Sequence, residues 1–368
     1  MNIYWGDLRG YSRLSDGRRS PDDHYAYARD TAKLDFCAIT DQVDNVPAAK
    51  LGLMDEEAWR KLQAAARKFN ETGRFVTLLA CERTVPSWDG KTPGSVCFYY
   101  KKDDVPFLKA RHPQRDWLRR RAIKLDAEMQ EIWDQHKEIE CLKAVIHSSS
   151  GRHGYTWPEA PTRYQVDLVE MHSKWGSSDA AGTPFPVTDA AGEPPRPHGY
   201  AQDALLAGFK PGFIGGSGTH FGMPGSELWE NDWANVARYD KGGLTGVCAE
   251  ELSRDPVFDA LKSRLCYATT GERIELYFTI NHAPMGSVIT EAGKLRIHVR
   301  AAGTRPIKRA EVFKNGSIIH HKIGGREAFE MYFDEPAPAE PAWYYVRVTQ
   351  AGEDSAWSSP IWVAPQQE

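Results

Sequence analysis

The sequence predicts an α/β protein in which a distorted TIM-like β/α barrel precedes a small antiparallel, sandwich-like β domain. Three observations lead to this prediction. Short apolar runs in the first two thirds of the chain end in polar residues, and these runs alternate with helical patterns up to about residue 275. A two-residue alternation replaces that pattern after about residue 279. We therefore expect the barrel at residues 1–278 and the β domain at residues 279–368.

Helices are expected where cap signals or an apolar stripe occur. The run Ser-Pro-Asp-Asp at residues 20–23 places an N-cap, a proline at the first helical position and two acids in the first turn, which predicts a helix to about Lys33. An apolar stripe predicts a second helix over residues 55–70, and a third is expected over 118–140. A short fourth helix is expected over 200–207.

Strands are expected between these helices, in a mainly parallel sheet. The apolar runs that predict them lie at residues 36–39, 75–80, 142–146, 166–169 and 213–214. The Pro- and Gly-rich segment 177–198 predicts a long loop over the mouth of the barrel. The glycine-rich segment 215–220 lacks the spacing of nucleotide-binding motifs, so we interpret it as a tight turn that brings His220 to the pocket.

The C-terminal region shows the alternation of antiparallel strands. Residues 295–300, 310–314 and 343–348 alternate apolar and polar side chains. Asn315-Gly316 is a strong signal for a two-residue hairpin turn.

Composition narrows the possible partners. The net charge of -4 and the pI near 6.3 give no reason to expect nucleic-acid binding, and the basic run 111–124 is interpreted as the solvated face of a helix. We expect no membrane contact, because the sequence contains no apolar run of about 18 residues. The expected location is the cytoplasm, with a removed signal peptide as the open alternative. Six widely spaced cysteines are interpreted as core thiols. The oligomeric state is not predicted.

Several spaced stretches resemble one family. They are Tyr4-Trp5-Gly6-Asp7-Leu8 with Ser15-Asp16-Gly17, Leu34-Asp35-Phe36 with Thr40-Asp41, Val169-Glu170 with Gly176-Ser177-Ser178, Tyr267-Ala268-Thr269-Thr270-Gly271, and Trp357-Ser358-Ser359-Pro360-Ile361-Trp362. The chain thereby resembles an uncharacterised family of PHP-like proteins, related to the polymerase-and-histidinol-phosphatase metal hydrolases. The resemblance covers nearly the whole chain. It implies a distorted β/α barrel whose strand ends hold up to three divalent metals for phosphoester hydrolysis.

The chain departs from the ligand set that the resemblance implies. At positions where a metal ligand is expected it carries Arg9, Tyr11, Gln42, Ser95, Ser148, Trp175 and Gly218. The ligand-type residues that remain are Asp16, Asp41, Glu82, His147, Glu170 and His220. Losses spread over all the motifs should abolish tight metal binding, since such sites need several converging imidazoles and carboxylates.

Arg9 strengthens this expectation. A guanidinium among carboxylates stays protonated and repels a divalent cation, so we predict that Arg9 pairs with Glu82 or another remaining acid. No metal or other cofactor is therefore expected. The alternative is a weakly bound divalent ion, such as zinc or manganese, held by Glu82, His147 and Glu170.

Three functional hypotheses stay open. In the first, the pocket binds a small anionic molecule and acts on it by acid–base chemistry without a metal, as a hydrolase or lyase. Its expected catalytic residues are Arg9, Tyr11, Asp41, Glu82, His147 and His220, and its expected substrate-binding residues are Asp16, Gln42, Glu170, Lys174 and Trp175. In the second, the chain is a catalytically inactive binding or structural protein. In the third, it is a metal-dependent phosphoesterase with a reduced site.

Each candidate also has a structural interpretation. Asp7, Asp16 and Asp41 flank turns and could cap backbone amides. Tyr11 and Trp175 could fill space that metals and imidazoles occupy in the family. His172 follows Glu170 by two residues, so strand alternation predicts that both point to the same side.

Overall fold

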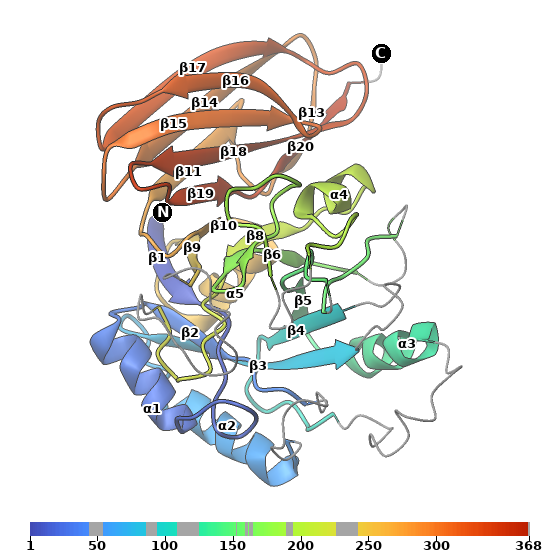
Figure 1. Cartoon of the computed structure of the whole chain (residues 1–368), viewed down its shortest axis with the longest axis vertical. Coiled ribbons are helices and arrows are strands. Elements are labelled where there is room, and N and C mark those ends of the chain that lie inside the picture. Colours follow the sequence, from blue (N-terminus) through green and yellow to red (C-terminus); the bar gives the residue numbers. More distant parts are fainter. Residues whose placement is uncertain are drawn as a thin grey trace.

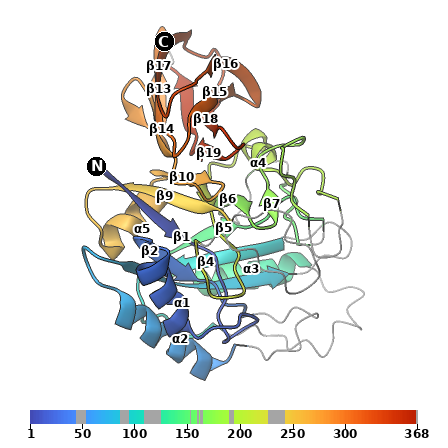
Figure 2. The ribbon, with the colours of Figure 1, turned by 60° about the vertical axis from the view of Figure 1, so that its left-hand side comes forward.

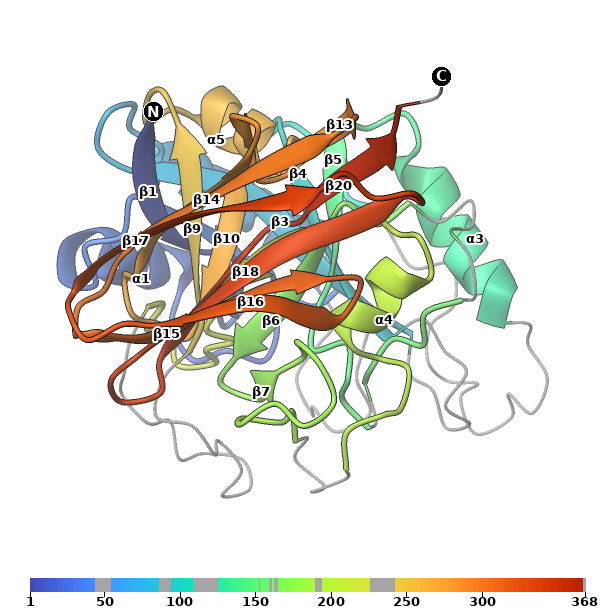
Figure 3. The ribbon, with the colours of Figure 1, turned by 90° about the horizontal axis from the view of Figure 1, so that it is seen from above.

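The computed structural model describes residues 1–43, 54–85, 94–108, 125–151, 153–158, 161, 165–188, 194–225 and 242–366 (Figure 1). We call residues 1–269 the body and residues 275–365, which form strands β11 to β20, the C-terminal strands. In Figure 1 the C-terminal strands lie above the body, and Figure 2 shows the same order from another side. Seen from above, they cross over the strands of the body (Figure 3).

The body is rich in strands and holds few helices. Its elements in chain order are β1 (Asn2–Asp7), α1 (Pro21–Ala26), a π-helical turn (Tyr27–Thr31), β2 (Phe36–Ile39), α2 (Glu56–Phe69), β3 (Val76–Val85), β4 (Gly94–Tyr100), α3 (Leu125–His136), β5 (Cys141–Val145), β6 (Leu168–Ser173), β7 (Gly176–Ser177), α4 (Ala201–Leu206), β8 (Gly212–Gly215), β9 (Leu244–Ala249), α5 (Arg254–Lys262) and β10 (Cys266–Thr269).

The first two helices begin at the predicted caps. The Ser20 hydroxyl accepts a hydrogen bond from the Asp23 amide (3.1 Å), and Pro21 occupies the first helical position. The Asp55 carboxylate accepts a bond from the Ala58 amide (2.8 Å). These side chains satisfy amides that have no partner within the first helical turn. The predicted starts of α1 and α2 are confirmed.

The third helix is described from Leu125 onward. Its expected start at residue 118 and the basic run 111–124 lie outside the described residues. Among the helices that are described, none is long and apolar enough to cross a membrane. The cytoplasmic location stays a prediction.

The sheet of the body is mixed, so the expectation of mainly parallel strands is wrong. Pairs β1–β2, β2–β3, β5–β6 and β6–β8 are parallel, whereas β1–β9, β9–β10, β3–β4 and β4–β5 are antiparallel. A parallel neighbour needs a crossover of a dozen or more residues. Only residues 86–93 separate β3 from β4, so this pair returns as a hairpin.

β8 and β9 meet through one side chain and through one backbone bond beside the strands, from the Gly243 amide to the Gly216 carbonyl (3.0 Å). β8 pairs with β6 and β10 with β9, and we find no backbone ladder between β8 and β9 in the described part of the chain. Instead, the Thr245 hydroxyl accepts a bond from the Gly215 amide (3.0 Å) and donates one to the Gly215 carbonyl (2.7 Å). The structure is thus a sheet-rich mixed α/β body, and a regular TIM barrel is not what it shows.

The C-terminal strands form two packed layers. Their bounds are β11 (Glu275–Ile280), β12 (Ala283–Pro284), β13 (Val288–Glu291), β14 (Lys294–Ala302), β15 (Ile307–Lys314), β16 (Ser317–Ile323), β17 (Ala328–Pro336), β18 (Ala342–Gln350), β19 (Ser355–Ser358) and β20 (Ile361–Pro365). The three predicted strands fall in β14, β15 and β18. Asn315 and Gly316 join β15 to β16 with φ of +48° and +84°, as the predicted hairpin turn requires.

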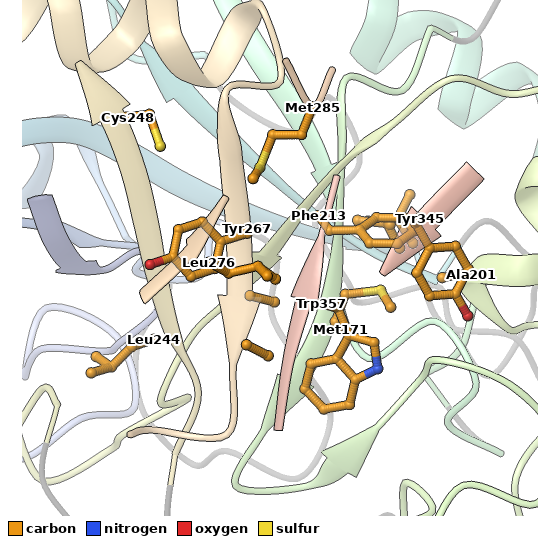
Figure 4. Close-up of a cluster of buried hydrophobic side chains, with 14 of the residues drawn as sticks. Met171, Ala201, Phe213, Leu244, Cys248, Tyr267, Leu276, Met285, Tyr345 and Trp357 are labelled. Atoms are coloured by element: carbon orange, nitrogen blue, oxygen red, sulfur yellow. The ribbon is translucent and has the colours of Figure 1, made fainter. Parts of the chain in front are cut away.

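Both regions share a sheet and a core. β19 pairs antiparallel with β10 of the body, so the sheet continues from one region into the other. In Figure 4, Phe213 and Met171 of the body lie beside Tyr345 and Trp357 of the C-terminal strands. The rings of Phe213 and Tyr345 meet edge to face with centroids 5.5 Å apart. The predicted division after residue 278 falls inside β11, and two separate domains remain a prediction.

Candidate functional site

A buried ion pair joins two predicted site residues across the body. Arg9 follows β1 and Glu170 lies in β6, and the Arg9 Nη1 donates to both carboxylate oxygens at 2.8 and 3.1 Å. Each residue is 2% exposed. Burial alone would lower the pKa of Arg9, but the charge of Glu170 raises it well above its usual value. Arg9 therefore does pair with an acid, and the acid is Glu170 rather than Glu82.

A second pair extends this network to Glu82. The Arg9 Nε donates to the Tyr11 hydroxyl (3.2 Å), and Tyr11 donates to Glu82 Oε2 (2.5 Å). The other Glu82 oxygen accepts a bond from the Thr84 hydroxyl (2.8 Å). Burial raises the pKa of Tyr11 well above its usual value, so the phenol keeps its proton and acts as a donor. We call Arg9, Tyr11, Glu82 and Glu170 the strand-end network.

Asp41 has a structural role in the adjacent turn. Its carboxylate accepts bonds from the Ser12 amide (2.7 Å), the Ser12 hydroxyl (2.6 Å) and the Ser15 hydroxyl (2.6 Å). Complete burial raises its pKa to about 7, although these bonds oppose the rise. Gln42 makes an isolated backbone bridge to Glu82 and is half-buried. The turn interpretation fits Asp41 better than direct chemistry.

His220 lies at the more exposed mouth of the network. Its ring stacks on Tyr11, with centroids 4.3 Å apart. Its Nε2 is 3.2 Å from Asp16 Oδ2, and its Nδ1 is 3.1 Å from Lys174 Nζ. Burial opposes ionisation of Asp16, but neighbouring His220 brings the pKa of Asp16 below its usual value. The side chains of His220 and Asp16 keep 17% and 18% of their exposure, so solvent reaches both.

The turn that carries Lys174 and Trp175 lies beside the strand-end network. These two residues connect β6 to β7, and the Lys174 amide donates to the Ser217 carbonyl (3.2 Å). Gly218 has a φ of +67°, and a Cβ there would lie 3.5 Å from the Arg9 Cζ and 3.6 Å from the Trp175 Nε1. Trp175 and Arg9 therefore flank Gly218, at the place where the family resemblance expects an acid.

His147 remains neutral in this setting. It follows β5 with a φ of +32°, and its amide donates to Glu170 Oε1 (3.1 Å). Burial, together with the charge of Arg9, lowers its pKa well below the usual value for histidine. Its Nδ1 is buried without a hydrogen-bond partner. His147 thus supports Glu170 through its backbone.

His172 does not follow the predicted alternation. The β6–β8 register shifts between Glu170 and His172, which marks an irregularity in the ladder. The His172 Nδ1 lies 2.7 Å from the Ser177 hydroxyl, and its ring stacks near Trp357. Glu170 instead contacts Arg9. The irregularity separates two residues that strict alternation would place together.

The residues present do not fit a metal site. Across the described ranges, no group of three or more His, Cys, Asp or Glu side chains is placed to hold a metal ion. Both oxygens of Glu170 face Arg9, and both oxygens of Glu82 accept hydroxyl protons. A metal at Glu82, His147 and Glu170 would have to displace these donors and lie beside a guanidinium.

Two further acids of the body are completely buried. Asp7 accepts amide bonds from Arg9 (3.0 Å), Ser217 (2.9 Å) and Gly225 (3.0 Å), so its turn interpretation is the one that the structure supports. Asp179 is completely buried against the C-terminal strands. Its partners lie more than 160 residues along the chain, so local sequence holds no signal for them.

Comparison with known proteins gives three kinds of match. A family model described as "Protein of unknown function (DUF3604)" matches residues 228–283. Uncharacterised proteins of Chlamydia pneumoniae and Chlamydia muridarum are 26% and 28% identical over 98% of this chain. The chain spans 57% of the length of these curated relatives.

The third match is to a solved structure. A two-domain protein from Bacteroides vulgatus, containing a predicted PHP-like metal-dependent phosphoesterase, aligns over 95% of this chain and 91% of its own. The identity is 13% and the TM-score is 0.47. At that score the similarity does not establish a shared fold. The chain thus has uncharacterised relatives and a family match limited to one segment.

Proposed function

We propose that this chain is a PHP-like protein, with a distorted form of the family's barrel, that binds a small anionic molecule at the strand ends without a metal. His220 is the proposed acid–base group. The observation that carries the proposal is the Arg9–Glu170 pair with a 2.8 Å contact, which puts a permanent cation where the family resemblance implies metal ligands. The sequence stretches shared with the family support the same assignment.

The mouth supplies the groups that can meet a ligand. Lys174 Nζ lies against His220 Nδ1, and Asp16 holds Nε2. The His220 Nδ1 also lies 3.1 Å from the Gly218 carbonyl. An anion that binds the Lys174 ammonium would draw it away from the imidazole, and Nδ1 could then exchange a proton with the ligand. Asp16 would stabilise the imidazolium that forms. This order of events couples binding of an anion to the activation of His220.

A second candidate is a binding or structural protein that performs no chemistry. It is favoured by one observation: the strand-end network is buried, and each charged member already has a partner within it. A site that has lost its catalytic function is expected to contain salt bridges and aromatic side chains of this kind in place of a bound ligand. The two candidates differ in whether the mouth binds an anion and turns it over.

Thermal unfolding with added ions separates the candidates. Inorganic phosphate should raise the melting temperature of the wild type, whereas manganese and zinc chloride should not. Lys174→Met should abolish the phosphate effect. Lys61→Met is the matched control, because it removes the same charge from an exposed helical pair with Glu57. Stabilisation by metal without phosphate would overturn the proposal in favour of a reduced metal site.

Turnover tests the chemical part of the proposal. Hydrolysis of p-nitrophenyl phosphate and p-nitrophenyl acetate is measured in the presence of a chelator. The wild type should turn over at least one of them, and His220→Gln should lose that activity while phosphate still stabilises it. An absence of both turnover and phosphate stabilisation in the wild type would favour the non-catalytic candidate.

A further inference from the structure

Asp179 forms a buried junction between the body and the C-terminal strands. It lies two residues after β7 and is 0% exposed. Its Oδ1 accepts a bond from the Tyr345 hydroxyl (2.9 Å), and its Oδ2 accepts bonds from Arg347 Nη1 (2.8 Å) and Trp357 Nε1 (3.0 Å). All three donors belong to β18 and β19.

The carboxylate depends on these donors. A charge without access to water is costly unless a counter-charge and hydrogen bonds surround it. The counter-charge here is Arg347, which also donates to Glu311 through its Nε (2.9 Å). Tyr345 is fixed in turn by a bond from Gln202 (2.7 Å). The C-terminal strands therefore hold the Asp179 carboxylate, while its main-chain carbonyl accepts a bond from the Gln202 amide of α4 (3.2 Å).

Asp179 is four residues from the tip of the β6–β7 hairpin, where Lys174 and Trp175 lie. The Ser178 amide donates to the Met171 carbonyl (2.9 Å), which ties the returning chain to β6. These backbone bonds link the tip to Asp179, although the tip also donates to the Ser217 carbonyl and accepts from the Thr188 amide. We expect a change in the position of Asp179 to alter the position of the tip.

We propose that Asp179 is a positioning residue through which the C-terminal strands hold Lys174 and Trp175 at the mouth of the site. The effect on ligand binding rests on the proposed function, whereas the effect on the hairpin does not. The C-terminal strands are then part of the site's framework.

Hydrogen exchange with mass spectrometry tests the effect on the hairpin. Asp179→Asn leaves Arg347 without this counter-charge, and exchange in residues 171–178 should accelerate by about tenfold or more while β2 and β3 stay unchanged. Glu311→Gln is the matched control, because it removes the other carboxylate from Arg347 and leaves Asp179 intact. Its hairpin exchange should match the wild type. The pair Asp179→Asn with Arg347→Gln, which removes both charges, should return exchange toward the wild-type rate.

Other outcomes would overturn the inference. Unchanged exchange in residues 171–178 of Asp179→Asn would do so, as would an equal acceleration in β2 and β3, which indicates a purely global loss of stability. If Asp179→Asn does not fold, Tyr345→Phe serves instead, since it removes one donor and keeps the ion pair. It should give a smaller acceleration confined to the hairpin.

Measuring the affinity for phosphate tests whether Asp179 affects ligand binding at the mouth. The affinity should fall in Asp179→Asn and stay at the wild-type value in Glu311→Gln, at a temperature where both are folded. Wild-type affinity in a variant with accelerated hairpin exchange would overturn the link to the mouth. If the wild type itself does not bind phosphate, the proposed function fails, and the exchange result still decides the role of Asp179 in the hairpin.

Discussion

Replacing Arg9 with methionine removes one partner of the buried ion pair and keeps most of the side-chain volume. Glu170 would then keep hydrogen bonds from the His147 amide and the Ser173 hydroxyl but would lose its counter-charge. Burial raises the pKa of Glu170 even with Arg9 present. Without that cation the carboxyl will take up a proton rather than remain charged in the interior.

This proton uptake sets the size of the effect. Glutamate has an ordinary pKa of about 4.3, and each pKa unit corresponds to about 1.4 kcal/mol. Keeping Glu170 protonated therefore costs at most about 4 kcal/mol at pH 7 and about 1 kcal/mol at pH 5. A raised pKa in the folded state means that stability is greatest at low pH and is lost as pH rises above the unfolded value. Arg9→Met should be much less stable than the wild type at pH 7 and nearly equal at pH 5.

Urea unfolding followed by circular dichroism at both pH values measures the difference. The double variant Arg9→Met with Glu170→Gln buries no charge and should recover to within about 1 kcal/mol of the wild type. Arg60→Met, which breaks an exposed helical pair with Glu56, serves as control and should cost only about 0.5 kcal/mol. A loss below about 1 kcal/mol for Arg9→Met at pH 7, or a double variant no better than the single one, would refute the reasoning.

Three further predictions concern the turn that holds Asp41, the contact between Thr245 and Gly215, and the cysteine thiols. The pKa of Asp41 is raised to about 7 from an ordinary value of about 3.9, so the wild type should lose up to about 4 kcal/mol from this group as pH rises from 4 to 7. In urea unfolding, the stability of Asp41→Asn should not fall in this way between pH 4 and pH 7. The prediction is contradicted if the stabilities of the variant and the wild type change in parallel with pH. Thr245→Val removes the hydroxyl that bonds the Gly215 amide and carbonyl, so the free energy of unfolding, measured in the same way, should fall by about 2 kcal/mol. A variant as stable as the wild type would contradict a stabilising role for this contact. Five cysteines are buried and Cys141 is half-buried, with its pKa raised by burial to about 11, so Ellman's reagent at pH 8 should react slowly and at Cys141 first. Rapid reaction of two or more thiols would contradict this burial.

Local signals predicted the parts of the fold that depend on neighbouring residues. The caps at Ser20 and Asp55 and the turn at Asn315-Gly316 each act within four residues, and the structure contains all three. Pairing between distant strands has no such local code. The predicted strands do not include β4. This strand is antiparallel to both β3 and β5 and breaks the expected parallel order.

The candidate site shows the same limit. A buried guanidinium is costly without a counter-charge, so the residue type alone predicts that Arg9 pairs with a carboxylate. The choice of Glu170 over Glu82 depends on which strand ends face each other across the body. Asp41 carries both a catalytic prediction and a turn interpretation, and the Ser12 and Ser15 hydroxyls that contact it agree with the turn interpretation. The contacts of Asp179 depend wholly on tertiary structure.

The pairing of β19 with β10 also protects an edge. Cutting the chain after residue 278 would remove β19 and leave one side of β10 with unpaired amides and carbonyls. It would also uncover Phe213 and Met171, which lie beside Tyr345 and Trp357 (Figure 4). An open edge beside an apolar surface invites pairing with other chains. A shortened protein ending at that point should therefore aggregate. We infer that the C-terminal strands reduce self-association by covering this strand edge and this apolar surface.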